Sequence, residues 1–285
     1  MIAITGATGQ LGRQVIDTLL KSVAAKDIVA AVRSPEKAAD LAARGLQVRQ
    51  ADYAQPATLS GAFAGVEKLL LISSSEVGQR EAQHQAVIDA ARRAGVKLIA
   101  YTSLLHADRS PLGLGVEHRA TEAALQASGI PFVILRNGWY SENYAASIAP
   151  AIAHGVFAGA AGEGRIASAA RQDYAEAAAA VLVKEDQAGK IYELAGDSAY
   201  TLTEFAAQIA ASSGKSVSYQ NLSEADFTAL LKGAGLPDGL AAMLADSDVG
   251  ASQQGLFDDS HTLSTLIGRP TTPWQQTVEA TIKHS

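Results

Sequence analysis

Residues 1–20, MIAITGATGQLGRQVIDTLL, decide the fold of this chain. A short apolar run at residues 2–5 leads directly into three glycines, Gly6, Gly9 and Gly12, and the next segment has helical spacing of apolar residues. This order of strand, glycine-rich turn and helix is the context in which such glycines approach a phosphate. Gly6 permits the tight turn, Gly9 lets the backbone approach a pyrophosphate, and Gly12 allows the helix to pack closely on the sheet. The stretch therefore predicts a dinucleotide site.

The helix behind the glycine turn supplies free N–H groups and a positive field for the phosphates. We expect the dinucleotide to contact the turn and the start of this helix, at Gly6, Ala7, Thr8, Gly9, Gln10 and Leu11. A structural turn without a ligand is the alternative.

The end of the second apolar run bears on which dinucleotide binds. NAD-binding versions of the motif carry an Asp or Glu about 20 residues beyond the glycines, on the ribose 2′-hydroxyl. This chain has VRSPEK at residues 32–37, with Arg33 in that place. A guanidinium matches the adenosine 2′-phosphate in charge and in forked geometry, and Lys37 adds to the field. The sequence predicts NADP(H) over NAD(H), with a solvated Arg33 as the alternative.

Apolar runs alternate with helix-length segments along the first half of the chain. The predicted strands are residues 2–5, 28–32, 46–50, 68–73, 97–102 and 131–136. This alternation predicts an α/β fold with a doubly wound parallel sheet, whose ligands bind at the carboxyl ends of the strands. A helix is expected over residues 10–21, and another over residues 34–45, with Ser34 at its N-cap and Gly45 past its end.

The alternation of apolar runs and helix-length segments ends after residue 136, where a glycine- and alanine-rich stretch begins. A short strand is expected at residues 190–196, and a helix beginning at Thr201. We predict a dinucleotide-binding domain over residues 1–136 and a smaller α/β lobe, mainly substrate-binding, over residues 137–285. The two lobes are expected to be integral, with a cleft between them.

Composition excludes several classes of protein. The 285 residues include no cysteine, which removes disulfides, thiolate metal sites and thiol catalysis, and we predict no metal site. The net charge of −6, with Lys and Arg dispersed, argues against a nucleic-acid partner. No apolar run approaches the roughly 18 to 20 residues of a membrane helix, and the N-terminus lacks a secretory signal. We therefore expect a cytoplasmic protein without membrane contact.

Further cofactor contacts are expected where the later strands end. Asp52 follows the third strand and either accepts a bond from the adenine amino group or caps the next helix. Ser73, Ser74 and Ser75 follow the fourth strand, where they either border the cofactor ribose or cap a helix starting near Val77. Tyr101 and Thr102 end the fifth strand, where the nicotinamide is expected.

Several segments together resemble a known family. These are TGATGQLG, Arg33 after the second strand, ADY at residues 51–53, AYTS at residues 100–103 and LRNGWYSENY at residues 135–144. The chain is similar to the NmrA-like group of atypical short-chain dehydrogenases, with the nearest likeness to bacterial NAD(P)H:quinone oxidoreductases and triphenylmethane reductases. The resemblance covers nearly the whole chain and implies a Rossmann-type fold.

Most dehydrogenases of that superfamily use a Tyr followed four residues later by a Lys, and none of the 8 tyrosines here has that spacing. His118 and Glu122 stand at the approximate positions, and no lysine occurs from residue 98 to residue 183. Reducing an isolated ketone needs a positioned acid, whereas a quinone gives a delocalised anion that takes its proton from solvent. His118 is a candidate proton donor, and a structural histidine is the more common case.

The segment RNGWYSENY is the predicted seat of a flat acceptor, because it combines aromatic faces with amide groups. Tyr140, Asn143 and Tyr144 are the expected acceptor contacts. The cofactor is expected to touch Asn137, Gly138 and Trp139 from this segment, and Ser168 from the second lobe. Core packing is the alternative for each aromatic residue.

The sequence thus favours an NADPH-dependent quinone oxidoreductase that transfers hydride directly to a planar acceptor. Two alternatives stay open: a non-catalytic NADP(H)-binding redox sensor of the NmrA type, and a reductase of triarylmethane dyes. The expected partner is a small planar electrophile, and the sequence does not indicate an oligomeric state.

Overall fold

The computed structural model describes residues 1–284 and divides into two compact units. Unit 1 comprises Met1–Ala107, Val116–Asn137 and Gln172–Tyr192. Unit 2 comprises Asp108–Gly115, Gly138–Arg171 and the described part of the chain from Glu193 onward. Within residues 1–284, no helix has both the length and the apolar composition that crossing a bilayer requires.

Unit 1 is built on a sheet with the strand order β3-β2-β1-β4-β5-β6-β8. The strands are β1 (Ile2–Thr5), β2 (Ile28–Val32), β3 (Gln47–Gln50), β4 (Lys68–Leu71), β5 (Leu98–Leu104), β6 (Phe132–Asn137) and β8 (Ile191–Leu194). Each neighbouring pair from β3 to β6 is parallel. The chain runs outward from β1 to β3 and then returns to place β4 on the other side of β1. This reversal is the switch point at which doubly wound folds bind ligands, and the predicted fold class is confirmed.

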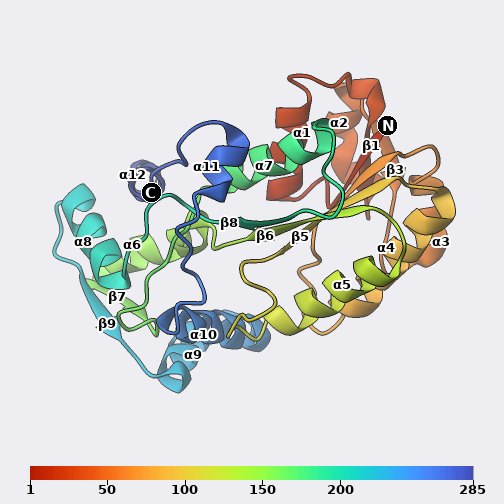
Figure 1. The fold of residues 1–285 in the computed structure, drawn as a ribbon. Helices are drawn as coiled ribbons and strands as arrows, with labels where there is room; N and C mark the ends of the chain where they lie inside the picture. Colours follow the sequence, from red (N-terminus) through yellow and green to blue (C-terminus); the bar gives the residue numbers. More distant parts are fainter. Residues whose placement is uncertain (285) are drawn as a thin grey trace. The chain divides into compact units, whose positions relative to one another are not determined.

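Helices cover both faces of this sheet, with α1 and α7 on one face and α3, α4 and α5 on the other (Figure 1). The helical elements are α1 (Gln10–Leu19), η1 (Ala25–Asp27), η2 (Pro35–Ala38), α2 (Ala39–Ala43), α3 (Pro56–Ala62), α4 (Arg80–Ala94), α5 (Gly115–Ala127) and α7 (Arg171–Val183), where η denotes a 3₁₀ helix. Because both faces are covered, β1, β2 and β4 are nearly continuous apolar runs, and all of β2 is buried.

Two predicted helices differ from the sequence-based expectation, although the first begins after Ser34 as predicted. The helix predicted over residues 34–45 is divided into η2 and α2, and the Ser34 side chain makes no cap hydrogen bond. The helix expected near Val77 begins at Arg80 instead. Gly78 has a φ of +86° and donates its N–H to Glu117 on α5, so the chain cannot enter the helix earlier.

Unit 2 contains a two-stranded parallel sheet and seven helical elements among its described residues. They are β7 (Val156–Gly159), β9 (Ser218–Asn221), η3 (Ser141–Tyr144), α6 (Ala145–His154), α8 (Leu202–Ser213), α9 (Glu224–Gly233), α10 (Asp238–Ser252), α11 (Thr262–Ile267) and α12 (Trp274–Lys283). The predicted helix start at Thr201 is confirmed, because Thr201 and Glu204 form a reciprocal capping box at the start of α8.

Aromatic rings form much of the interior of unit 2. Tyr144 and Phe157 both pack on Phe205, with ring centroids 5.3 Å and 5.1 Å from it. Tyr200 lies 4.4 Å from Trp274, at the start of α12. The segment that carries Tyr144 is therefore anchored in a packed core.

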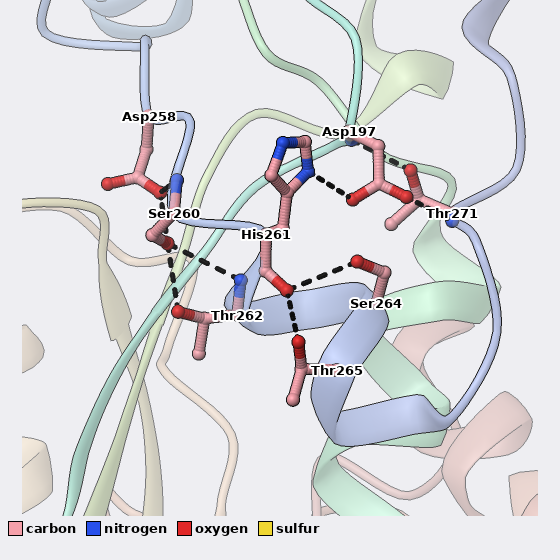
Figure 2. A network of polar contacts seen from close by, with 8 residues as sticks. All are labelled: Asp197, Asp258, Ser260, His261, Thr262, Ser264, Thr265 and Thr271. Atoms are coloured by element: carbon pink, nitrogen blue, oxygen red, sulfur yellow. Dashed lines mark hydrogen bonds and ion pairs between the residues drawn. The ribbon is translucent and has the colours of Figure 1, made fainter.

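A polar network joins the loop after β8 to the segment before α11 (Figure 2). Asp197 accepts a hydrogen bond from the Thr271 backbone N–H at 2.9 Å and lies 3.0 Å from His261 Nδ1. Burial would raise the pKa of Asp197, but hydrogen bonds led by the Thr271 backbone hold it below its usual value. His261 adopts a left-handed φ of +54°, and Asp197 ties this unusual turn to Thr271.

Candidate functional site

A cavity of about 510 Å³ lies at the carboxyl ends of the first four strands in unit 1. Its lining includes Gly6, Thr8 and Gly9 after β1, Arg33 and Lys37 after β2, Asp52 after β3, and residues 72–76 after β4. The cavity is within the size range of small-ligand and cofactor sites. The structure thus brings eight of the predicted cofactor residues together: Gly6, Thr8, Gly9, Arg33, Asp52, Ser73, Ser74 and Ser75.

The glycine turn has the geometry that close backbone packing requires. Gly6 adopts a φ of +58°, and the Gly9 N–H donates to the Gly6 carbonyl at 2.9 Å. A Cβ atom at Gly12 would lie 2.4 Å from the Gly6 carbonyl oxygen, so no larger residue fits there. Ala7 and Leu11 are buried behind the turn, while Gln10 is exposed at the start of α1.

Arg33 reaches the cavity from the end of β2 and forms an ion pair with Glu76, in which Arg33 is the more exposed residue. Its Nη1 atom lies 3.1 Å from Glu76 Oε1, and the two side chains are 70% and 48% exposed. Lys37 lines the same region. Two cationic side chains therefore stand on the β2 side of the cavity, and one of them is held by a carboxylate from the β4 side.

Asp52 is held by local hydrogen bonds and does not cap α3, whose N-cap residue is Gln55. Its carboxylate accepts hydrogen bonds from the Ala54 N–H at 3.0 Å and from Gln55 Nε2 at 2.9 Å, just before α3. The same residue lines the cavity. A local turn therefore orients Asp52, and the adenine contact stays a prediction.

The loop from Ser73 to Glu76 is held by buried side chains on neighbouring elements. The Ser73 N–H donates to Thr102 Oγ1 at 2.8 Å, and the Ser74 N–H donates to His84 Nε2 at 2.9 Å. The Ser74 carbonyl accepts from Arg80 Nε at 2.8 Å. This wall of the cavity is therefore rigidly supported from α4 and β5.

The hydrogen bonds of His84 determine where its proton lies. Because Nε2 accepts from Ser74, the proton resides on Nδ1, which lies 2.9 Å from Thr121 Oγ1. Burial, with a smaller contribution from the charge of Arg80, lowers the pKa of His84 to about 3. His84 is thus neutral near pH 7 and acts as a fixed acceptor beneath the loop.

The positions of the usual Tyr–Lys pair hold a different arrangement. His118 Nδ1 lies 2.7 Å from the hydroxyl of Tyr101, and neither residue lines the cavity. Burial, followed by the charge of Arg80, lowers the pKa of His118 to about 3, and burial raises the pKa of Tyr101. His118 is therefore a neutral, hydrogen-bonded histidine, and proton donation by it stays a prediction.

Glu122 is engaged in a buried ion pair with Arg136 on β6. The guanidinium donates from Nε and Nη2 to the two carboxylate oxygens at 3.0 Å and 2.8 Å. Ser103 on β5 donates to the same carboxylate. This position thus carries a paired anion in place of the lysine of ordinary dehydrogenases.

Asn137 and Trp139 lie at the start of the predicted acceptor segment. Asn137 is 6% exposed, and within residues 1–284 its Oδ1 atom has no hydrogen-bond partner. The Gly138 N–H donates to the Leu194 carbonyl, and Trp139 is 7% exposed in unit 2. The cofactor contacts expected of these three residues stay predictions.

Tyr140, Asn143 and Tyr144 differ sharply in exposure. Tyr140 is half-buried beneath the Arg171 guanidinium, 5.0 Å from its ring centroid, and Asn143 is exposed on η3. Tyr144 is buried, and its hydroxyl donates to Asp248 Oδ1 at 3.1 Å. Tyr144 thus takes the core position that the sequence left open as its alternative, while Tyr140 and Asn143 retain accessible surface.

Ser168 belongs to a buried chain of hydroxyl groups in unit 2. Its Oγ lies 2.8 Å from Ser141 Oγ and 2.9 Å from the Tyr200 hydroxyl. These contacts fix the start of η3, and the cofactor contact of Ser168 stays a prediction.

Glu76, Gln83 and Asp248 were not identified from the sequence. Glu76 and Gln83 line the cavity, but they belong to a loop and a helix with no motif at those positions. Asp248 meets Tyr144 across 104 residues of chain, and no local pattern signals such a pairing.

The fold and the cavity define a dinucleotide-binding α/β protein. The glycine turn excludes side chains from the phosphate seat, and α1 has no acidic residue in its first turn to oppose bound phosphates. Arg33 and Lys37 bring two positive charges to the cavity lining, at the place where the sequence predicts a 2′-phosphate. The residues present therefore fit a dinucleotide that carries a 2′-phosphate.

Comparison with known proteins agrees with this class. A family model described as NAD(P)H-binding matches residues 6–185, and the chain belongs to this family. Quinone oxidoreductase 2 of Escherichia coli (strain K12) is 67% identical over 278 residues, covering 98% of this chain and 97% of that protein. The resemblance to bacterial quinone oxidoreductases is thereby confirmed.

Two solved structures are similar over the whole fold. An E. coli NADPH-dependent quinone oxidoreductase in complex with NADPH is 66% identical, with a TM-score of 0.96 and coverage of 98% of this chain and 99% of that one. The triphenylmethane reductase of Citrobacter sp., in complex with NADP(H), is 40% identical, with a TM-score of 0.95 and coverage of 99% and 100%. The relationship to triphenylmethane reductases is therefore also confirmed.

Proposed function

We propose that this protein is an NADPH-dependent quinone oxidoreductase. The observation that carries the proposal is the 67% identity, across 98% of the chain, to a quinone oxidoreductase. A related structure with NADPH bound is similar at a TM-score of 0.96. The cavity described above supplies the chemistry that such a cofactor needs.

Arg33 is the proposed contact for the adenosine 2′-phosphate. Its guanidinium lines the cavity, and no acidic residue stands at the end of β2 to accept a ribose 2′-hydroxyl. Arg33→Ala should weaken NADPH binding and leave NADH binding nearly unchanged. Equal weakening of both cofactors would contradict the assignment.

Bound NADPH supplies a hydride to the acceptor. The chain's part in this chemistry is to hold and orient the two reactants, because positioning alone supplies a large share of the rate in direct transfer. At the Tyr–Lys positions, burial keeps His118 neutral, and Glu122 is paired with Arg136. A quinone suits such a site, because hydride transfer to it gives a delocalised anion. This anion needs no positioned acid and takes its proton from water afterwards.

Tyr140 and Asn143 are the proposed acceptor contacts. Tyr140 offers a ring face partly covered by Arg171, and Asn143 offers an exposed amide that can donate to a quinone carbonyl. Tyr144 supports them from below, since its buried ring and its bond to Asp248 fix the end of η3.

The test is stopped-flow oxidation of NADPH by benzoquinones and naphthoquinones. Asn143→Ala should lower the quinone rate by about tenfold while the Kd for NADPH stays the same, since one hydrogen bond is worth about 1.4 kcal/mol here. Gln253→Ala removes an exposed amide elsewhere in unit 2 and serves as the matched control. Absence of quinone reduction by protein that binds NADPH would refute the proposed function.

Reduction of triarylmethane dyes is a second candidate. It is favoured by the 40% identity and the TM-score of 0.95 to a triphenylmethane reductase. A cationic dye needs hydride alone, so the same site chemistry would serve it. Adding such a dye to the quinone panel compares the two acceptors directly, by their kcat/KM values.

A further inference from the structure

The Arg33–Glu76 ion pair crosses the cavity from one side to the other. Arg33 follows β2 and Glu76 follows β4, and these two strands flank β1 in the sheet. Both side chains line the cavity whose glycine turn follows β1. The pair therefore joins the β2 side of the cavity to the β4 side.

Glu76 is the fixed member of this pair. Its second carboxylate oxygen accepts from Gln83 Nε2 at 2.8 Å, and Gln83 is only 6% exposed. The Glu76 backbone N–H donates to Ser74 Oγ at 3.1 Å. Ser74 is in turn held by His84 and Arg80. The carboxylate thus stands on a supported loop, whereas the Arg33 side chain is 70% exposed and can turn.

We propose that Glu76 is a specificity-determining residue that competes with the adenosine 2′-phosphate for Arg33. This inference rests on the proposed use of NADPH. When the phosphate binds, Arg33 leaves Glu76 for a group that carries nearly two negative charges. NADH has no 2′-phosphate, so it leaves the Arg33–Glu76 pair in place. Glu76 consequently lowers the affinity for NADPH and not that for NADH.

The size of the effect follows from the exposure of the pair. Exposed ion pairs of this kind contribute about 0.4–1 kcal/mol, which corresponds to about two- to fivefold in Kd. A carboxylate left unpaired beside a bound phosphate adds repulsion in the same direction. Salt should reduce the difference, because both charges are accessible to counterions.

The test compares cofactor affinities of wild type, Glu76→Gln and Glu36→Gln by titration of NADPH and NADH fluorescence. Gln at position 76 still accepts from Gln83 but carries no charge to hold Arg33. Glu36 is exposed on η2 outside the cavity lining, so Glu36→Gln removes the same charge nearby without breaking the pair. We expect the Kd for NADPH to fall about two- to fivefold in Glu76→Gln alone, with the NADH value unchanged.

Three outcomes would overturn the inference. A rise in the NADPH Kd would mean that Glu76 orients Arg33 for the phosphate. A parallel fall in the Kd values of both cofactors would indicate a general electrostatic effect. An unchanged Kd for NADPH would mean that Glu76 does not compete for Arg33. Quinone turnover is measured separately. If the ratio of the NADPH Kd to the NADH Kd changes but no quinone is reduced, only the proposed function fails. If quinones are reduced but this ratio is the same in wild type and Glu76→Gln, only this inference fails.

Discussion

Asp248 lies in the interior of unit 2 and should give the protein a distinctive dependence of stability on pH. The residue is 2% exposed, and its carboxylate accepts hydrogen bonds from the Tyr144 hydroxyl and the Ala160 N–H. Burial outweighs these two bonds and raises the pKa of Asp248 from 3.8 to about 6. The folded protein therefore binds this proton more tightly than the unfolded chain does.

The sign of the effect follows from that order of pKa values. The contribution of Asp248 to stability is complete below about pH 4 and is lost as the pH rises through about 6. At about 1.36 kcal/mol per pKa unit, the loss by pH 7 is on the order of 3 kcal/mol. For a chain of this size that corresponds to roughly 6–12 °C in melting temperature.

Asp248→Asn removes the titration and keeps the hydrogen bonds. The amide oxygen accepts from Ala160, and the amide nitrogen donates to the Tyr144 hydroxyl, which turns from donor to acceptor. Melting curves from pH 4 to 7.5 should therefore show wild type losing stability relative to the variant as the pH rises. Asp259→Asn, at an exposed site, is the matched control. Parallel curves for wild type and Asp248→Asn would refute the reasoning.

Two further substitutions test the packing of the site in unit 1. Gly12→Ala places a Cβ 2.4 Å from a loop carbonyl and should lower both the melting temperature and NADPH affinity, the latter by about tenfold or more; Gly61→Ala, with no atom within 4 Å, should leave both intact. Glu122→Ala removes the carboxylate partner of the buried Arg136 guanidinium and should cost about 3–5 kcal/mol in urea denaturation. A loss no larger than that of Glu81→Ala, at an exposed position on α4, would contradict this estimate.

The features that sequence reasoning predicted well are those with a local physical cause. A strand buried on both faces must be apolar along its whole length, so β2 was visible as a continuous run. The glycine turn was recognisable because Gly6 needs a positive φ and Gly12 has no room for a Cβ. Arg33 was found because its distance from the glycines is set by one βα unit.

The features that escaped prediction depend on contacts between distant parts of the chain. Glu76 bonds to Arg33, 43 residues earlier, and Asp248 bonds to Tyr144, 104 residues earlier. The start of α4 depended on Gly78 bonding to Glu117 on another helix. For Tyr144 the sequence left an acceptor contact and core packing both open, because an aromatic residue has the same local pattern in a binding site and in a core; the structure buries its ring.

The ion pair between Glu122 and Arg136 also limits how this chain can evolve. Introducing Tyr at 118 and Lys at 122 would restore the spacing of an alcohol dehydrogenase in two substitutions. The new lysine, however, would face the Arg136 guanidinium, which now lies 2.8 Å from the Glu122 carboxylate in a buried site. Two cations cannot share that space without severe loss of stability. Arg136 must therefore change first or together with Glu122, so alcohol chemistry is at least three coordinated substitutions away.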